Sequence, residues 1–333
     1  MADFYLSPLR GITDKIFRTA YERRFGRFDR MVAPFVPTIL GNRVKNHHIR
    51  DLLPAISTSP DGPPVDKRLI PQIIGREPGG FLLLSRKFAD MGFTSVNWNL
   101  GCPAPLVAKK TRGCGLLPHK DIIGRFLDGV IPKLPLPLSI KTRLGYESPN
   151  DLEALIPLFN GYPIKELIIH PRTGIQLYGG TADLDRFESC LNISKHTVVY
   201  NGDIVSVDTF KRLADRFPSV NKWMLGRGIV MNPFLLTELR EYVDGTGETK
   251  PAVSTVPAVS TKQSMITGFL DDILDACKNH PCPIKVLGRM KEIWRYLGSG
   301  IDGWEELSKR VVRCASLREY RTIIDAFNKE RPS

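Results

Sequence analysis

Short apolar runs of strand-forming residues alternate with helical patterns through roughly the first 240 residues of this chain. The runs expected to be strands are Phe4–Ser7, Phe28–Ala33, Leu69–Ile74, Ser95–Leu100, Leu138–Thr142, Glu166–His170, Thr197–Asn201 and Lys222–Leu225. The helical patterns between them include Asp14–Phe25, Gly80–Met91, Asp121–Ile131, Asn150–Phe159, Val207–Phe217 and Pro233–Tyr242. Eight strands with crossovers predict an α/β protein with a closed (β/α)8 (TIM) barrel over residues 1–243. An open doubly wound sheet is the alternative, but the Gly-rich loop that usually follows its first strand is absent from this sequence.

The chain after the barrel changes character twice. Residues 244–261 are rich in Gly, Pro, Ser and Thr, which is typical of a linker. Residues 262–330 are expected to form a small α-helical bundle, with helices at Lys262–Asn279, Pro283–Leu297, Trp304–Ala315 and Leu317–Phe327. A break is expected at Gly298-Ser299-Gly300.

Charge and cysteine content restrict the partners. The formal net charge of +12 weakly favours a polyanion such as nucleic acid. The 6 cysteines form no Cys-x-x-Cys pair and no zinc spacing, so we expect reduced thiols, a cytoplasmic protein and no metal. No apolar run is long enough to span a membrane, and no export signal is visible at the N-terminus. We expect a monomer.

Basic and aromatic residues are interleaved in the second helix of the expected bundle. Arg289, Lys291 and Arg295 are joined there by Trp294 and Tyr296. Such a pattern can hold phosphates and stack on bases. An amphipathic helix with its aromatics inside and its charges outside is at least as good an interpretation.

Polar residues follow many of the expected strands, at the rim where barrels of this kind carry out chemistry. They are Ser7, Gln72, Asn99, Cys102, Lys141, Arg143, His170, Arg172, Asn201, Asp203 and Arg227. Gly202 and Gly226 follow strands seven and eight, where the backbone can approach an anion, and Arg227 adds a planar cation suited to phosphate. These turns indicate a phosphorylated cofactor, with Lys141 placed to stabilise negative charge on its ring system.

Cys102 lies in the run Asn99-Leu100-Gly101-Cys102-Pro103, just after the fourth expected strand. The flanking Gly and Pro hold it on a tight turn, as expected for a reactive side chain. Taken alone, a lone cysteine is more often a small buried hydrophobe.

In this order, the motifs resemble those of the tRNA-dihydrouridine synthases over essentially the whole chain. The matching segments are Ser7–Asp14, Asn99–Pro103, Gly113–Leu117, Lys141–Arg143, His170–Thr173, Asn201–Ile204 and Gly226–Gly228. The resemblance implies an FMN enzyme that reduces the C5–C6 double bond of particular uridines in tRNA, with NADPH as electron source. Segment Arg289–Leu297 looks similar to the C-terminal helix of bacterial synthases that modify position 16.

The resemblance also implies roles for single residues. FMN contacts would fall on Ser7, Pro8, Leu9, Gln72, Lys141, His170, Asn201, Gly202, Asp203, Gly226 and Arg227. Substrate contacts would fall on Asn99, Arg143, Arg172, Arg289, Lys291 and Arg295, and Cys102 would be the proton donor. Ser7, Leu9 and Arg10 depart from the family's opening motif, and a lysine usual after the Cys-Pro pair is missing.

Two other functions remain open at this point. One is a small-molecule FMN oxidoreductase of the dihydroorotate dehydrogenase type, which would have no use for a basic helical bundle. The other is a non-catalytic tRNA-binding relative, against which the presence of Cys102, Lys141 and His170 argues.

Overall fold

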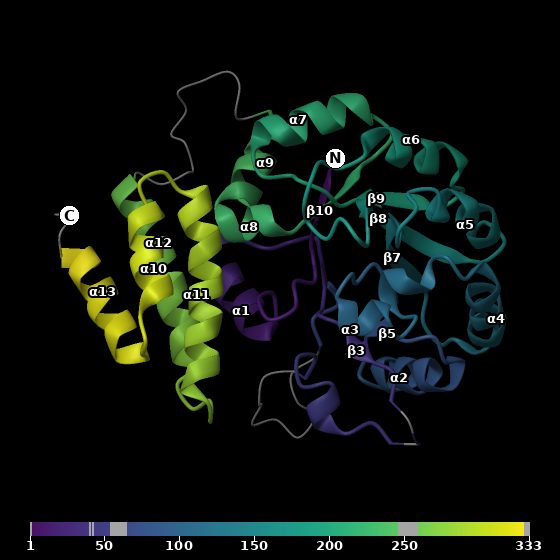
Figure 1. Ribbon diagram of the computed structural model, residues 1–333, viewed down its shortest axis with the longest axis horizontal. Coiled ribbons are helices and arrows are strands. Elements are labelled where there is room, and N and C mark those ends of the chain that lie inside the picture. Colours follow the sequence, from purple (N-terminus) through teal and green to yellow (C-terminus); the bar gives the residue numbers. More distant parts are fainter. Residues whose placement is uncertain (1, 40, 42, 54–64, 246–258, 330–333) are drawn as a thin grey trace.

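The computed structural model describes residues 2–39, 41, 43–53, 65–245 and 259–329. These residues form one parallel sheet of ten strands in the order β3-β5-β6-β7-β8-β9-β10-β1-β2-β4. The strands are β1 (Asp3–Leu6), β2 (Arg30–Val32), β3 (Val36–Pro37), β4 (Leu69–Ile70), β5 (Gln72–Ile74), β6 (Val96–Leu100), β7 (Leu138–Gly145), β8 (Ile164–Thr173), β9 (Thr197–Tyr200) and β10 (Lys222–Leu225). The expected barrel, followed by a helical bundle, is confirmed (Figure 1).

The sheet closes on itself through the segment that holds β4 and β5. Only Pro71, which has no backbone N–H to donate, separates these two strands. β4 pairs with β2, whereas β5 pairs with β6. One continuous segment therefore bridges both ends of the strand order, and the eight expected strands complete a barrel. The expected strand Leu69–Ile74 is interrupted at Pro71, and the short β3 is an addition to the expected set.

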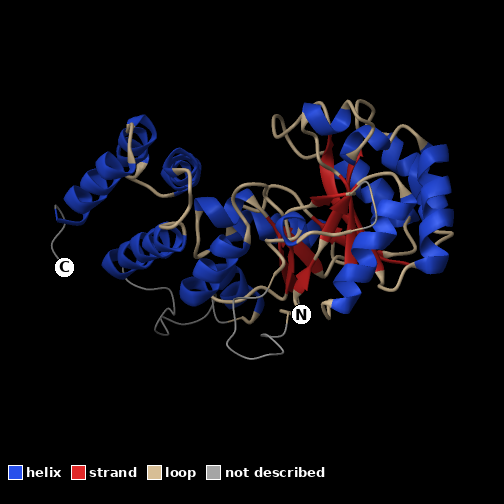
Figure 2. Cartoon of the chain, turned by 90° about the horizontal axis from the view of Figure 1, so that it is seen from below, coloured by secondary structure: helices blue, strands red, loops and turns tan. Residues whose placement is uncertain are grey.

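Helices cover the outside of the barrel, as Figure 2 shows. They are α1 (Lys15–Phe25), α2 (Pro78–Asp90), α3 (Pro105–Ala108), α4 (Lys120–Val130), α5 (Asp151–Phe159), α6 (Leu184–Ile193), α7 (Val207–Arg216), α8 (Arg227–Met231) and α9 (Leu235–Val243). Local chemistry sets their starts: the Asp14 carboxylate accepts from the Phe17 N–H at 3.1 Å, and Ser206 forms a capping box with Thr209.

Side chains alternate between the barrel interior and the helix layer, as the pleat of each strand requires. Trp98 of β6 points outward, where its ring stacks on Phe126 of α4 with centroids 4.0 Å apart. Its neighbours Asn97 and Asn99 belong to a buried hydrogen-bonded group that also includes Gln72. The polar groups of the interior are thus satisfied by one another, below the rim that carries the site.

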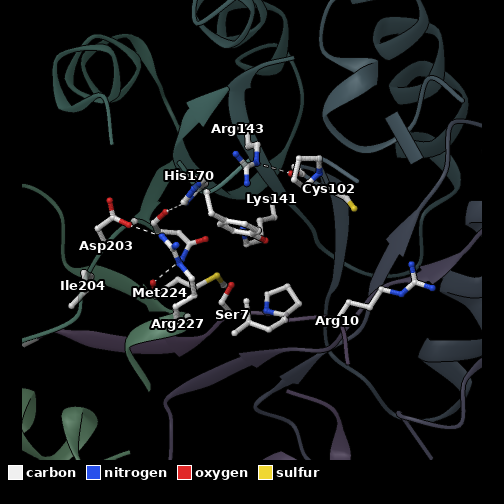
Figure 3. Close-up of a pocket in the computed structure, with 18 of the residues that line it drawn as sticks. Ser7, Arg10, Cys102, Lys141, Arg143, His170, Asp203, Ile204, Met224 and Arg227 are labelled. Carbon is white, nitrogen blue, oxygen red and sulfur yellow. Dashed lines mark hydrogen bonds and ion pairs between the residues drawn. The ribbon is translucent and has the colours of Figure 1, made fainter. Parts of the chain in front are cut away.

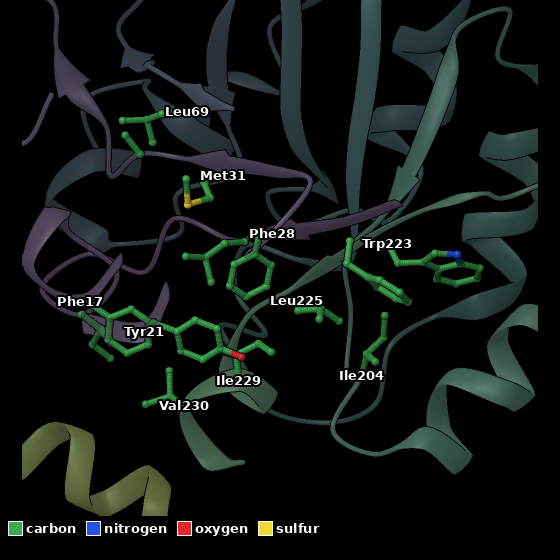
Figure 4. Packing of buried hydrophobic residues seen from close by; sticks show 14 of the residues in the cluster. Phe17, Tyr21, Phe28, Met31, Leu69, Ile204, Trp223, Leu225, Ile229 and Val230 are labelled. Atoms are coloured by element: carbon green, nitrogen blue, oxygen red, sulfur yellow. The ribbon is translucent and has the colours of Figure 1, made fainter. Parts of the chain in front are cut away.

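The C-terminal helices α10 (Val259–Ala276), α11 (Pro283–Gly300), α12 (Glu305–Arg313) and α13 (Leu317–Lys329) form the bundle. It packs on the barrel through a cluster of aromatic side chains. Phe269 of α10 meets Phe17 and Phe25 of α1 edge to face, with centroids 5.3 and 5.4 Å apart. Phe17 lies with Tyr21 in the same continuous core as barrel residues (Figure 4). The bundle therefore shares a hydrophobic core with the barrel.

One expectation for the bundle is corrected, and one open alternative is decided. The break at Gly298-Ser299-Gly300 is wrong, because α11 continues to Gly300. These glycines instead permit close packing, since a Cβ on Gly298 would lie 2.3 Å from the Ser308 Cβ. Trp294 is buried, stacks on Trp304 and donates to the Tyr320 hydroxyl at 3.1 Å. It is a core residue, and the amphipathic interpretation holds for it.

The boundaries at residues 243 and 262 stay predictions, because most of the expected linker 244–261 lies outside the described residues. Within the described ranges, no helix combines the length and apolar character needed to cross a bilayer. The same residues contain no group of three or more His, Cys, Asp or Glu side chains placed to hold a metal ion.

Candidate active site

A cavity opens at the carboxyl ends of the barrel strands (Figure 3). Residues expected from the sequence that line it are Ser7, Pro8, Leu9, Asn99, Cys102, Lys141, Arg143, His170, Asn201, Gly202, Asp203, Gly226 and Arg227. Five expected residues do not line it: Gln72, Arg172, Arg289, Lys291 and Arg295. The barrel thus gathers side chains from six strand ends around one space.

The side chain of Asn99 shapes the turn that carries Cys102. Its Oδ1 accepts from the backbone N–H groups of Gly101 and Cys102 at 3.0 and 2.8 Å. Its Nδ2 donates to Gln72 Oε1 at 2.7 Å, and Gln72 in turn donates to Asn97. The amide of Asn99 therefore fixes the position of the thiol, and Gln72 supports Asn99 from below.

A second loop clamps the same turn. Gly113 has a φ of +57°, and a Cβ there would lie 2.5 Å from the Cys102 carbonyl oxygen. The N–H of Cys114 donates to that oxygen at 3.2 Å. Only glycine combines this left-handed backbone with such a close approach. The tight turn around Cys102 is thus built from two segments of the chain.

The Cys102 thiol is held in its neutral form. Burial raises its pKa above the ordinary value of 9.0, although the backbone at Ala104 and the cations Arg10, Arg143 and Lys141 oppose the shift. A thiol in this state can donate a proton but is a poor nucleophile at neutral pH.

Lys141 and His170 bring polar groups without protein partners to the cavity. No described residue forms a hydrogen bond or ion pair with the Lys141 amine, and burial together with Arg143 lowers its pKa to about 7. The Nδ1 of His170 lies 2.6 Å from the Asn201 carbonyl oxygen, whereas its buried Nε2 has no partner. Both groups are available to a ligand.

At the far end of the cavity, two arginines share one carboxylate. Asp203 accepts from both Nη atoms of Arg172 at 3.0 and 2.5 Å, and from Arg227 at 2.8 Å. One positive charge therefore remains uncompensated within this group. Arg172, expected to touch substrate, is 2% exposed and also donates to Gly179 and Gly180, so it braces the loop instead.

Tyr178 is a cavity residue that sequence reasoning did not single out. Its ring covers the Arg227 guanidinium at 4.9 Å and the Arg143 guanidinium at 5.3 Å. Arg143 itself is committed to backbone carbonyls, donating to Gly101 at 3.0 Å and to Thr173 at 2.8 Å. Nothing in the sequence distinguishes Tyr178 from the other loop tyrosines, Tyr146 and Tyr162.

The expected RNA contacts of the bundle divide into two kinds. Arg289 forms a bidentate ion pair with Asp14, with both oxygens 2.6 Å away, and so ties α11 to the start of α1. Arg295 is exposed and Lys291 is partly exposed on the same helix. Arg289 therefore joins the two parts of the molecule, and the other two cations remain accessible.

The family model described as Dihydrouridine synthase (Dus) matches residues 5–282. The chain belongs to the dihydrouridine synthase family. This membership makes it a flavin-dependent oxidoreductase. The unpartnered Lys141 amine and His170 Nε2 fit such a group, because they offer a cation and a polar nitrogen to a ring in the cavity.

Relatives of this synthase family member match along most of its length. A probable tRNA-dihydrouridine synthase of Staphylococcus aureus (strain COL) is 26% identical, covering 98% of this chain and 93% of its own. One of Rickettsia bellii (strain RML369-C) is 25% identical, over 82% of this chain and 80% of its own.

Two solved structures share the fold of this dihydrouridine synthase family member. Histamine dehydrogenase from Rhizobium sp. 4-9 matches with a TM-score of 0.51 and 9% identity, over 79% of this chain and 49% of its own. A 2-naphthoyl-CoA reductase matches with a TM-score of 0.50 and 11% identity, over 74% of this chain and 50% of its own. At these identities the likeness concerns the fold alone.

Proposed function

We propose that the chain reduces the C5–C6 double bond of uridines in tRNA to give dihydrouridine, with FMN bound in the cavity and NADPH as reductant. The observation that carries this proposal is the convergence of Cys102, Lys141 and His170 on one cavity in a chain of the dihydrouridine synthase family. The names of the relatives, probable tRNA-dihydrouridine synthases, support tRNA as the substrate.

FMN would span the cavity from the Arg227 end to Lys141. Its phosphate would lie at Gly202, Gly226 and Arg227, where two guanidiniums share the single Asp203 carboxylate. Its ring would contact Lys141 and His170 Nε2 and pack on Ser7, Pro8 and Leu9, with Asn201 nearby. Gln72 is hydrogen-bonded to Asn99 and would influence the flavin ring through that side chain. When bound and reduced, the cofactor supplies a hydride to C6 of the uracil.

Cys102 would complete the reduction by giving its thiol proton to C5, where negative charge develops. The raised thiol pKa keeps this proton in place at neutral pH. Arg143 and Asn99 fix the turn through Gly101 and Cys102 and line the same space, so they would also orient the uracil. The target uridine has to be flipped out of the folded tRNA to reach this depth.

The helical bundle would grip the folded tRNA. Lys291 and Arg295 on α11 are accessible for phosphates. Arg289 would contribute by holding α11 against α1 through Asp14. The likeness of segment Arg289–Leu297 to synthases that modify position 16 makes uridine 16 the proposed target.

The decisive experiment maps dihydrouridine in tRNA from cells with and without the gene. Loss of dihydrouridine at position 16 alone, restored by the unaltered gene but not by Cys102→Ala, is the expected result. Unchanged dihydrouridine at every position would overturn the proposal. With purified protein, we expect FMN to copurify and NADPH to be consumed with tRNA. Reduction of a free pyrimidine base instead would favour the small-molecule oxidoreductase.

A further inference from the structure

A second concave surface lies on the same rim as the cavity, between the loop from β5 to α2 and the loop after α3. We call it the basic cleft. Four cations line it, Arg76, Lys109, Lys110 and Arg112, against one carboxylate, Glu77. Glu77 lies 3.6 Å from Arg76, whereas the other three cations form no ion pair with any described residue. The basic cleft is also more open to solvent than the cavity.

The backbone of the basic cleft also favours an anion. The thirteen-residue helix α2 begins at Pro78 in its wall, with Gly79 and Gly80 in the first turn. That turn holds no acidic side chain, and the N-cap residue Glu77 makes no capping hydrogen bond. A Cβ on Gly79 would meet no atom within 4 Å, so the surface of this first turn is open on that side. The helix start thus adds to the unpaired cations of the opposite wall.

One short segment of the chain carries both the reactive thiol and part of the basic cleft. Lys109 and Lys110 follow α3, which begins three residues after Cys102. The chain then returns through Gly113 and Cys114, which clamp the Cys102 carbonyl oxygen. A ligand held by these lysines is therefore positioned by the same short segment that positions the thiol.

The basic cleft and the bundle lie on different sides of the cavity mouth. The bundle packs against α1 and α8, which follow β1 and β10. The basic cleft follows β5 and β6, beyond β2 in the strand order, and the helices beside it, α2 and α3, lie away from the bundle (Figure 1). A macromolecule that covers the mouth from the bundle reaches the basic cleft if it extends across the barrel towards β5 and β6.

We infer that the basic cleft binds the phosphodiester backbone of the RNA substrate, so that RNA is held on both sides of the mouth while one uridine enters the cavity. This inference rests on the proposed function. An RNA strand suits the observations because the cations are spread along an open surface, and none of the lining residues is aromatic. A dinucleotide would require a base-stacking surface and direct access to the reacting ring.

The test is the salt dependence of tRNA binding by a Lys109→Gln/Lys110→Gln double variant. Each lost phosphate contact makes the plot of log affinity against log salt shallower by about one, so we expect a change of about two. At ~0.1 M salt we expect a roughly ten-fold weaker affinity. The matched control is Lys165→Gln/Lys195→Gln. Both lysines are exposed at the opposite end of the barrel, Lys165 at the start of β8 and Lys195 just before β9. Its slope should stay that of the unaltered chain.

The outcomes separate the inference from the proposed function. If the unaltered chain binds tRNA and the double variant has the slope and affinity of the control, the inference is overturned alone. If the unaltered chain does not bind tRNA, both the inference and the proposed function are overturned. If the double variant binds tRNA normally but loses NADPH-driven flavin reduction, the basic cleft serves the reductant, and the inference is equally overturned. Flavin content, measured by absorbance, should be equal in all variants.

Discussion

The His170 ring is directed by Asn201: its Nδ1 lies 2.6 Å from the Asn201 carbonyl oxygen, which can only accept. The proton must therefore reside on Nδ1, and the buried Nε2 faces the cavity as a lone pair. Burial and the cations Arg143 and Lys141 lower the pKa of this ring well below its ordinary 6.5. A neutral imidazole with a fixed tautomer is thus built into the site.

The pH dependence of stability should reveal this ring. Above the ordinary pKa of 6.5 the ring is neutral in both the folded and unfolded states, so it contributes no pH dependence. Below 6.5 only the unfolded state takes up the proton, and the free energy of unfolding should fall by roughly 1.4 kcal/mol per pH unit until the folded pKa is reached. Urea unfolding of flavin-free protein between pH 7.5 and 5.5 checks this. His170→Asn should remove that part of the slope, and an unchanged slope contradicts the assignment.

Flavin affinity should depend on the protonation of Lys141. The pKa of its amine, about 7 in the free protein, should rise when the anionic ring of reduced FMN binds beside it. Binding of reduced FMN then takes up a proton, so its affinity should be greatest below pH 7 and weaken as pH rises above it. Lys141→Met should weaken binding and abolish the dependence, while Lys195→Met should preserve it. Anaerobic titration with reduced riboflavin excludes effects of the FMN phosphate, and a slope retained in Lys141→Met would refute this role.

Replacing Cys102 by Ala should separate cofactor binding from catalysis. We expect unchanged flavin content and a rate of dihydrouridine formation lower by about 10²- to 10⁴-fold, the usual contribution of a general acid. Because the pKa of the thiol lies above 9.0, the rate of the unaltered enzyme should stay flat from pH 7 to 9 and fall only at higher pH. Single-turnover assays with prereduced enzyme measure both effects. A rate that falls between pH 7 and 8 would argue for a thiolate or another donor.

Gly113→Ala should disturb the turn that holds the thiol. The new Cβ would lie 2.5 Å from the Cys102 carbonyl oxygen, on a residue whose φ is +57°. We expect a loss of about 1–3 kcal/mol in unfolding free energy and a slower reduction. Gly288→Ala is the control, since that helical position in α11 has open space and alanine favours helices by roughly 1 kcal/mol. Equal stability changes in both variants would show that the close approach is unimportant.

Arg289→Gln should act on stability and leave RNA binding largely intact. The variant removes a bidentate contact to Asp14 across the barrel–bundle interface, and we expect a loss of about 1–3 kcal/mol in unfolding free energy. A double-mutant cycle with Asp14→Asn, which retains an N-cap for α1, isolates the pair. The salt dependence of tRNA binding should not change. A shallower slope would show that Arg289 touches phosphate.

Sequence patterning predicts the barrel well because buried parallel strands are apolar throughout and their ends carry polar rim residues. Cys102, Lys141 and His170 are identified in this way. The sequence pattern does not show which long side chains already form contacts within the protein. Arg289 lies 275 residues from its partner Asp14, and no local feature reveals that pairing. Arg172 is likewise a rim residue by position and a buried brace by contact.

Turn geometry explains the other differences. The closure of the barrel depends on Pro71, which divides one expected strand into β4, paired with β2, and β5, paired with β6. The hydrophobic pattern of the sequence does not reveal such a division. Gly298 and Gly300 predict a helix end, yet both lie inside α11, where they allow close contact with α12 and α8. The sequence does not distinguish a glycine that ends a helix from one that allows another helix to pack closely.

The aromatic contact between α1 and α10 has a consequence for synthesis of the chain. Phe17 and Phe25 are translated long before Phe269, which covers them. The nascent barrel therefore carries an uncovered aromatic face, and β1 lacks its neighbour until β10 is made. Products that terminate before α10 should be captured by chaperones and degraded.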